Sequence, residues 1–126
     1  MKIVIRSFIP AALSFIVATI LFCLPGEDLP ETDIIQADKI VHIGLFATLV
    51  SLWCLPLIPL KKDYAKVRGM FVKVALLFVV YGVAIEFIQG NFIPGRTFGV
   101  DDMVADAIGS VFGLLFSNWQ LKKQLS

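Results

Sequence analysis

The chain has 126 residues, of which 58% are hydrophobic, and its formal net charge at pH 7 is +1. A soluble domain is typically about 45–50% apolar, so this composition argues against an ordinary soluble protein. The near-neutral charge provides no broad basic surface, which argues against nucleic acid as a partner.

The apolar residues gather in four runs: Phe8–Leu24, Ile40–Leu60, Met70–Ile88 and Met103–Trp119. A membrane-spanning helix needs roughly 17–25 apolar residues, because it rises about 1.5 Å per residue across a hydrocarbon core about 30 Å thick. All four runs qualify, although the first and last are near the short limit. We therefore predict an all-α fold, a single polytopic membrane domain over residues 1–126 with transmembrane helices at approximately 7–24, 39–60, 68–89 and 102–119.

Basic residues predict the orientation of these helices. Nine of the 11 Lys and Arg residues lie in the N-terminal arm, around the loop between the second and third runs, or in the C-terminal tail. Lys39 and Arg96 are the exceptions. Because positive charge stays on the cytoplasmic side of a membrane, both termini are expected in the cytoplasm.

Local signals predict where the helices begin and end. Asp38 is expected to cap the second helix, and Asp101 or Asp102 the fourth, since Asp accepts hydrogen bonds from the first free N–H groups. The second helix should end near Pro56 and Pro59, and the segment Lys61–Gly69 should be a basic loop. Gly90-Asn91 should stop the third helix, and Pro94-Gly95 predicts a turn beyond it.

Small residues recur along the predicted fourth helix, at Ala105, Gly109 and Gly113. Small residues at four-residue spacing let a neighbouring helix approach closely. The stripe indicates tight packing inside the bundle, and it is also compatible with a homo-oligomer.

Seven polar residues cluster at the outward end of the predicted bundle. Ionisable groups at membrane depth are costly and usually functional. Within each of three helices, two of these polar residues are three or four positions apart and so share one face. His42, Glu86 and Asp106 then lie at a similar depth, roughly 5–8 Å below the outer ends of their helices. The residues are Asp38, His42, Glu86, Gln89, Arg96, Asp102 and Asp106.

The chemistry of these side chains indicates a phosphate-bearing ligand at the headgroup level of the outer leaflet. Arg can bind phosphate through two parallel hydrogen bonds. His exchanges protons near neutral pH, and Asp38 could fix the tautomer of His42. We assign catalytic roles to His42, Glu86 and Asp106, and binding roles to Arg96, Gln89, Asp102 and Asp38.

Structural explanations compete with these roles. Asp38 and Asp101 would serve as helix caps, Gln89 would satisfy helix-end carbonyls or pair across helices, and an Arg96–Asp102 salt bridge would hold the loop. A divalent metal on Glu86, Asp102 and Asp106 is a further alternative. No tight metal-ligand motif is present, so no cofactor is predicted.

Three pieces of the chain, in this order and spacing, resemble the VanZ-like family of small bacterial membrane proteins. They are Asp38-Lys39-Ile40-Val41-His42, Glu86-Phe87-Ile88-Gln89, and Pro94-Gly95-Arg96-Thr97-Phe98 leading to Asp102-Met103-Val104-Ala105-Asp106 and Gly109. The resemblance runs from about Pro25 to Gly113. The family usually has Asn at the position of Asp106, so this chain adds a potential charge there.

The resemblance implies a four-helix bundle in the bacterial cytoplasmic membrane. It places six polar residues in one outward-facing pocket: His42, Glu86, Gln89, Arg96, Asp102 and Asp106. It also implies hydrolysis or transfer at lipid headgroups or polyprenyl-linked intermediates, with membrane lipids or lipid-linked precursors as partners. Two alternatives stay open: a non-enzymatic binder of a lipid or glycopeptide, since the founding member is associated with teicoplanin resistance, and a structural or partner-binding bundle. Whether the protein is an enzyme is therefore open.

Overall fold

The computed structural model describes residues 8–25, 37–60, 63–95 and 98–125, and every regular element in these ranges is helical. This confirms the all-α prediction for the described part of the chain. The elements are α2 (Ile9–Phe22), α3 (Ala37–Cys54), the 3-10 helix η2 (Leu55–Leu60), α4 (Tyr64–Phe92) and α5 (Val100–Leu125).

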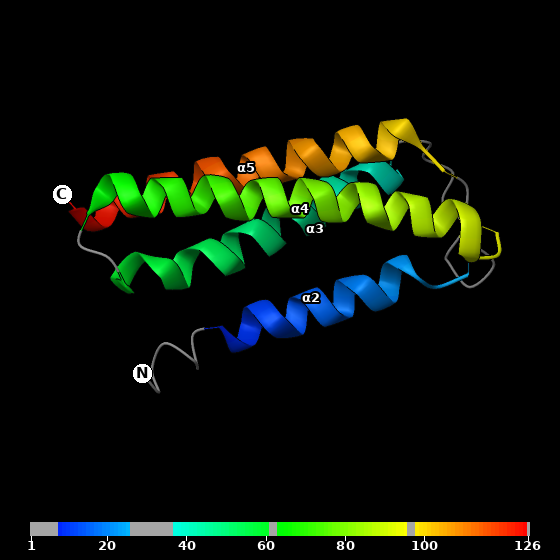
Figure 1. Cartoon of the computed structure of the whole chain (residues 1–126), viewed down its shortest axis with the longest axis horizontal. Helices are drawn as coiled ribbons and strands as arrows, with labels where there is room; N and C mark the ends of the chain where they lie inside the picture. The colour runs from blue at the N-terminus through cyan, green and yellow to red at the C-terminus, as the bar shows by residue number, and fades with distance from the viewer. Residues whose placement is uncertain (1–7, 26–36, 61–62, 96–97, 126) are drawn as a thin grey trace.

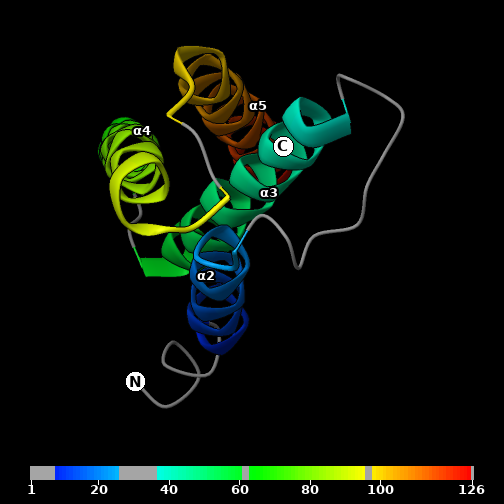
Figure 2. The ribbon, with the colours of Figure 1, turned by 90° about the vertical axis from the view of Figure 1, so that its right-hand side faces the viewer.

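The helices form one bundle in which α3 packs against α2, α4 and α5. Figure 2 shows α3 between α2 and α5, with α4 alongside. Helix α2 ends and α3 begins at the same end of the bundle at which α4 ends and α5 begins (Figure 1). Residues near these four helix ends are therefore brought to one end of the molecule, although they are distant in the sequence.

Several predicted helix boundaries are wrong by a few residues. Helix α4 begins at Tyr64, inside the expected loop, because Asp63 caps it by accepting a hydrogen bond from Ala65 N at 3.0 Å. It also continues through Gly90 to Phe92. Helix α5 extends to Leu125. The end of the second helix was predicted more accurately. Helix α3 ends at Cys54 and is followed by the 3-10 helix η2, which contains Pro56 and Pro59. Proline lacks the N–H that an α-helix needs for its hydrogen bonds.

The predicted caps at the starts of α3 and α5 are also misplaced. Asp38 lies inside α3, and α5 begins at Val100, so Asp101 and Asp102 lie in its first turn. Acidic residues are favourable there because the N-terminal end of a helix carries partial positive charge. An Asp near the start of a helix is therefore expected both just before the helix and in its first turn, and the sequence does not distinguish the two positions.

Two glycines allow close contact between α5 and α3. A Cβ atom on Gly109 would lie 2.5 Å from the carbonyl oxygen of Ile43, and one on Gly113 would lie 2.7 Å from Val50 Cβ. Both distances are too short for a real side chain. The small-residue stripe thus serves packing within the chain, as predicted, and its partner is α3.

The surface of the bundle is apolar over much of its length. On α4, for example, Leu76, Leu77 and Val80 are 59%, 67% and 65% exposed. Among the described residues, the segments Lys39–Pro59 and Tyr64–Phe92 are long and apolar enough to cross a membrane, while Ile9–Phe22 is apolar but shorter. Exposed apolar helix faces of this kind suit a lipid environment better than water.

Candidate functional site

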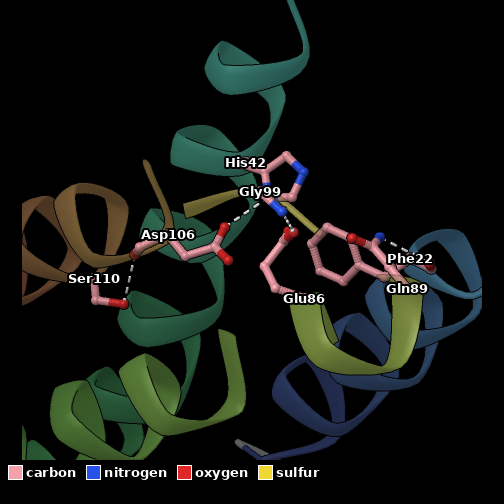
Figure 3. Close-up of polar contacts among 7 residues, drawn as sticks. All are labelled: Phe22, His42, Glu86, Gln89, Gly99, Asp106 and Ser110. Atoms are coloured by element: carbon pink, nitrogen blue, oxygen red, sulfur yellow. Dashed lines mark hydrogen bonds and ion pairs between the residues drawn. The ribbon is translucent and has the colours of Figure 1, made fainter. Parts of the chain in front are cut away.

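A buried ion pair joins α3 to α5. The Nδ1 atom of His42 lies 2.7 Å from Oδ1 of Asp106, and the two residues are 2% and 1% exposed (Figure 3). An ionised carboxylate can only accept hydrogen bonds, so when Asp106 is ionised the proton of this contact belongs to His42 Nδ1. The close approach at Gly109, three residues after Asp106, lets the two helices come near enough for the pair to form.

Glu86 extends from α4 toward the same place and is completely buried. Its Oε2 atom accepts a hydrogen bond from the backbone N–H of Gly99 at 3.2 Å. Its Oε1 atom is buried and has no hydrogen-bond partner among the described residues. Gly82, one turn earlier on α4, makes room for Asp106, because a Cβ atom there would lie 2.9 Å from Asp106 Oδ2.

These three residues form what we call the polar cluster: His42, Glu86 and Asp106. Each offers one atom that could bind a metal ion, and these atoms lie within 4.8 Å of one another. The ring of Phe22, at the end of α2, covers His42 with a centroid distance of 5.1 Å. The cluster is therefore a compact polar group enclosed by apolar packing, and each member comes from a different helix.

Asp102 lies outside this group. The sequence suggested Asp102 as a metal ligand together with Glu86 and Asp106. Among the described residues, the group that could hold an ion consists of Glu86, Asp106 and His42. Asp102 is half-buried in the first turn of α5, and its carboxylate borders Gly99. It lies one helical turn closer to the start of α5 than Asp106. It is therefore nearer the mouth of the bundle, by which we mean the end where α4 ends and α5 begins.

Gln89 links two helices. Its Nε2 atom donates a hydrogen bond at 2.9 Å to the carbonyl oxygen of Phe22, the last residue of α2. Both groups are buried. This contact fits the structural alternative for Gln89, because it satisfies a carbonyl that a helix end leaves without an intrahelical partner.

An exposed ion pair lies at the start of α3 and α5. Lys39 Nζ is 2.8 Å from Asp101 Oδ2, and the two side chains are 36% and 63% exposed. The hydrogen bond and charge of Lys39 hold the pKa of the Asp101 carboxyl below its usual range. Sequence reasoning missed this pair, although two opposite charges at the starts of packed helices were a usable signal.

Two of the predicted binding residues cannot be placed. Arg96 and the side chain of Asp38 lie outside the described residues. The turn before Arg96 is present as predicted, with Gly95 at a φ of 76°, in the left-handed region that favours glycine. The phosphate-binding and tautomer-fixing roles given to Arg96 and Asp38 stay predictions.

A comparison with protein families gives a match to the VanZ/LLP1 family over residues 4–120. The chain belongs to this family. No curated protein and no solved structure gives a significant match. The family match covers every residue of the polar cluster, and with the apolar helices it indicates a membrane protein.

In this VanZ/LLP1 family member, sequence reasoning missed contacts made by the backbone and by apolar side chains. The N–H of Gly99 bonds to Glu86, and the Phe22 ring covers His42. Neither contact has a signal in residue type or spacing, since any residue has a backbone N–H and phenylalanines are frequent in this chain. Gly82 could have been noticed, because it lies four residues before Glu86 on the same helix face.

Proposed function

We propose that the protein spans the bacterial cytoplasmic membrane four times, with both termini in the cytoplasm and the polar cluster near the outer face. Two observations support this topology. Exposed basic residues lie at the end of the bundle away from the cluster: Lys66 and Arg68 early in α4, and Lys122 and Lys123 late in α5. The second and third apolar runs are also long enough to cross a membrane, and the first and last are near the short limit.

Hydrolysis or transfer at the phosphate-bearing headgroup of a lipid, or of a lipid-linked cell-envelope intermediate, is the function that the site supports best. The observation that carries this proposal is the buried His42–Asp106 pair beside Glu86. Buried ionisable groups are costly unless they are paired, and such groups concentrate at functional sites. Membrane lipids or lipid-linked precursors are the corresponding partners.

The proposed reaction uses the cluster for proton transfer. Asp106 holds the proton on His42 Nδ1, so Nε2 can take a proton from the attacking water or alcohol. The attacking oxygen forms a new P–O bond while the bond to the leaving oxygen breaks. Glu86, when protonated, returns a proton to that oxygen. Arg96, with Asp102 near the mouth, positions the phosphate before the reaction.

Turnover by the purified protein tests this proposal. The full chain in lipid nanodiscs is given radiolabelled phospholipids and undecaprenyl phosphates, and products are separated by chromatography. We expect His42→Ala to lower turnover at least 100-fold, since a positioned acid or base contributes about 10²–10⁴-fold. Arg96→Ala should lower it by a similar factor, since loss of one preorganised donor to the developing charge costs about 10²–10³-fold. Asn91→Ala, an exposed change near the same end of α4, should leave turnover intact. Full activity in both site variants would rule out the assigned roles.

A structural role is the second candidate, because two buried hydrogen bonds join different helices: His42 to Asp106, and Gln89 to Phe22. On this view the cluster only stabilises the bundle. A double variant, Glu86→Gln with His42→Ala, would then lower the melting temperature, and no lipid would be altered. Saturable lipid or glycopeptide binding without product would instead support a non-enzymatic binder.

A further inference from the structure

The three side chains of the polar cluster provide one imidazole nitrogen and two carboxylates, from three different helices. Imidazole and carboxylate together are ligands of Zn²⁺ and of related divalent transition metals. We propose that His42, Glu86 and Asp106 bind a single divalent transition-metal ion, with Zn²⁺ preferred over Mn²⁺. Zn²⁺ is preferred because nitrogen-containing sites bind it more tightly than Mn²⁺.

The first argument is the state of Glu86. This side chain is completely buried, and its Oε1 atom has no hydrogen-bond partner within the described ranges. A buried polar atom without a partner is unusual in a native structure and calls for an explanation. Figure 3 shows the Glu86 carboxylate pointing toward His42 and Asp106. A bound cation between the three residues would satisfy that oxygen.

The second argument is charge. Two carboxylates that share a buried site repel each other when both are ionised, and burial penalises each of them further. A single neutral or protonated imidazole does not balance two negative charges. A divalent cation at the centre of the cluster neutralises both carboxylates at once.

The third argument is geometry. The candidate ligand atoms lie within 4.8 Å of one another, whereas ligands about 2.0–2.2 Å from a tetrahedral Zn²⁺ lie roughly 3.3–3.6 Å apart. His42 Nδ1 and Asp106 Oδ1 are already 2.7 Å apart, so binding requires these two atoms to separate slightly while the Glu86 carboxylate closes on them by up to about 1 Å. Glu86 can supply this movement by rotation about its side-chain bonds. The N–H of Gly99 orients its carboxylate, as outer hydrogen-bond donors do for metal ligands.

Three protein ligands leave one coordination position open on a tetrahedral ion. Water or a phosphate oxygen can occupy it, and a metal there would polarise the phosphate. Only this last step depends on the proposed function; metal binding itself does not. His42 would then be a metal ligand through its cluster-facing nitrogen, rather than the carrier of a proton on that atom.

Metal titration of the full chain tests the inference. The purified protein in detergent is stripped with EDTA and dialysed, then titrated with ZnCl₂, and bound metal is counted by mass spectrometry. We expect one Zn²⁺ per chain. Glu86→Gln and Asp106→Asn preserve side-chain shape and should each weaken binding at least tenfold, as should His42→Gln. The control Asp101→Asn makes the same chemical change in α5 at an exposed position and should bind Zn²⁺ like the wild type.

Spectroscopy distinguishes lost ligands from lost folding. X-ray absorption at the zinc edge should show one imidazole and oxygen ligands, and the imidazole signal should disappear in His42→Gln. The absence of stoichiometric Zn²⁺, or equal binding by wild type and all three cluster variants, would overturn the proposal. If Asp102→Asn lost Zn²⁺ binding while His42→Gln kept it, the metal site would lie at the mouth of the bundle and not in the polar cluster. That result would also overturn the proposal.

The two proposals fail separately. Stoichiometric Zn²⁺ without turnover of any lipid leaves the metal site standing and removes the proposed reaction. Lipid turnover that persists in EDTA, by a protein that binds no Zn²⁺, supports the reaction and removes the metal site.

Discussion

His42, Glu86 and Asp106 are buried because three helices close around them, and each depends on a neighbour that carries no charge. The Phe22 ring covers His42, the Gly99 N–H bonds to Glu86, and the missing side chain at Gly82 leaves space for Asp106. The members of the cluster were predictable from the sequence, since polar residues within apolar runs are conspicuous. Their partners were not: the sequence paired His42 with Asp38 on its own helix, whereas Asp106 on α5 lies 2.7 Å away.

The exposed Lys39–Asp101 pair has a pH dependence with a definite sign. Since Lys39 lowers the pKa of Asp101 in the folded protein, the pair stabilises the fold above the ordinary pKa of an unfolded Asp, about 3.9. That contribution disappears as pH falls through the lowered folded value. Lys39→Ala should raise the Asp101 pKa toward its usual range, as followed by NMR of ¹³C-labelled aspartate. Lys123→Ala, at the other end of α5, should not; equal midpoints in wild type and Lys39→Ala would contradict the assignment.

At the scale of elements, contact between α3 and α5 positions the cluster. The two helices touch through Gly109 and Gly113, where added side chains would collide with backbone or with Val50. Helix α2 is held differently, by Gln89 bonding to Phe22 O and by a 2.6 Å contact between Thr19 Oγ1 and Tyr81 Oη. An apolar cleft of about 410 Å³, lined by residues of α2, α3 and α4, lies beside that second contact. The α3–α5 pair is thus closely packed, and α2 is less so.

Substitution of Gly109 tests the role of this contact. Gly109→Ala should destabilise the protein by about 1–3 kcal/mol, a usual cost of inserting an extra group into a packed core. It should also move His42 away from Asp106. Gly44→Ala is the matched control, because a Cβ on Gly44 of α3 meets nothing within 4 Å. That change should be neutral or stabilising by up to about 1 kcal/mol, since alanine favours helix. Melting temperatures in detergent compare the two, and equal melting temperatures would show that α5 does not need the contact.

Helix positions were predictable to within a few residues because hydropathy and turn signals are local properties of the sequence. The rotation of each helix about its axis was not predictable, since the exposed faces of α4 are as apolar as its packed face. Leu77 is 67% exposed and Phe71 is buried. In water-soluble proteins a polar stripe marks the outward face. A chain adapted to hydrocarbon lacks that stripe, and only the few polar residues and small residues indicate which faces meet.

At the scale of the whole molecule, the distribution of charge predicts the orientation that the proposed function requires. Apart from Lys39, the described basic residues lie in the half of the bundle away from the polar cluster. A cytoplasmic reporter, such as green fluorescent protein, fused after Ser126 should therefore be active. Alkaline phosphatase, which works only outside the cytoplasm, should be inactive at the same position. The reverse result would place the cluster on the cytoplasmic side and remove the outer-leaflet lipid as substrate.

The near-complete burial of the cluster has a thermodynamic consequence for a ligand as large as a phosphate-bearing headgroup. With exposures of 0–2%, the three residues can contact such a ligand only in conformations where a covering group such as Phe22 has moved, whereas a metal ion held between them needs that movement for entry alone. The measured dissociation constant is then the intrinsic one divided by the fraction of molecules in such conformations. Each 1.4 kcal/mol needed to displace the cover weakens apparent affinity tenfold. Loosening the attachment of α2 through Gln89 would therefore lower stability while raising apparent affinity, so tight binding and a stable bundle are opposing demands on this protein.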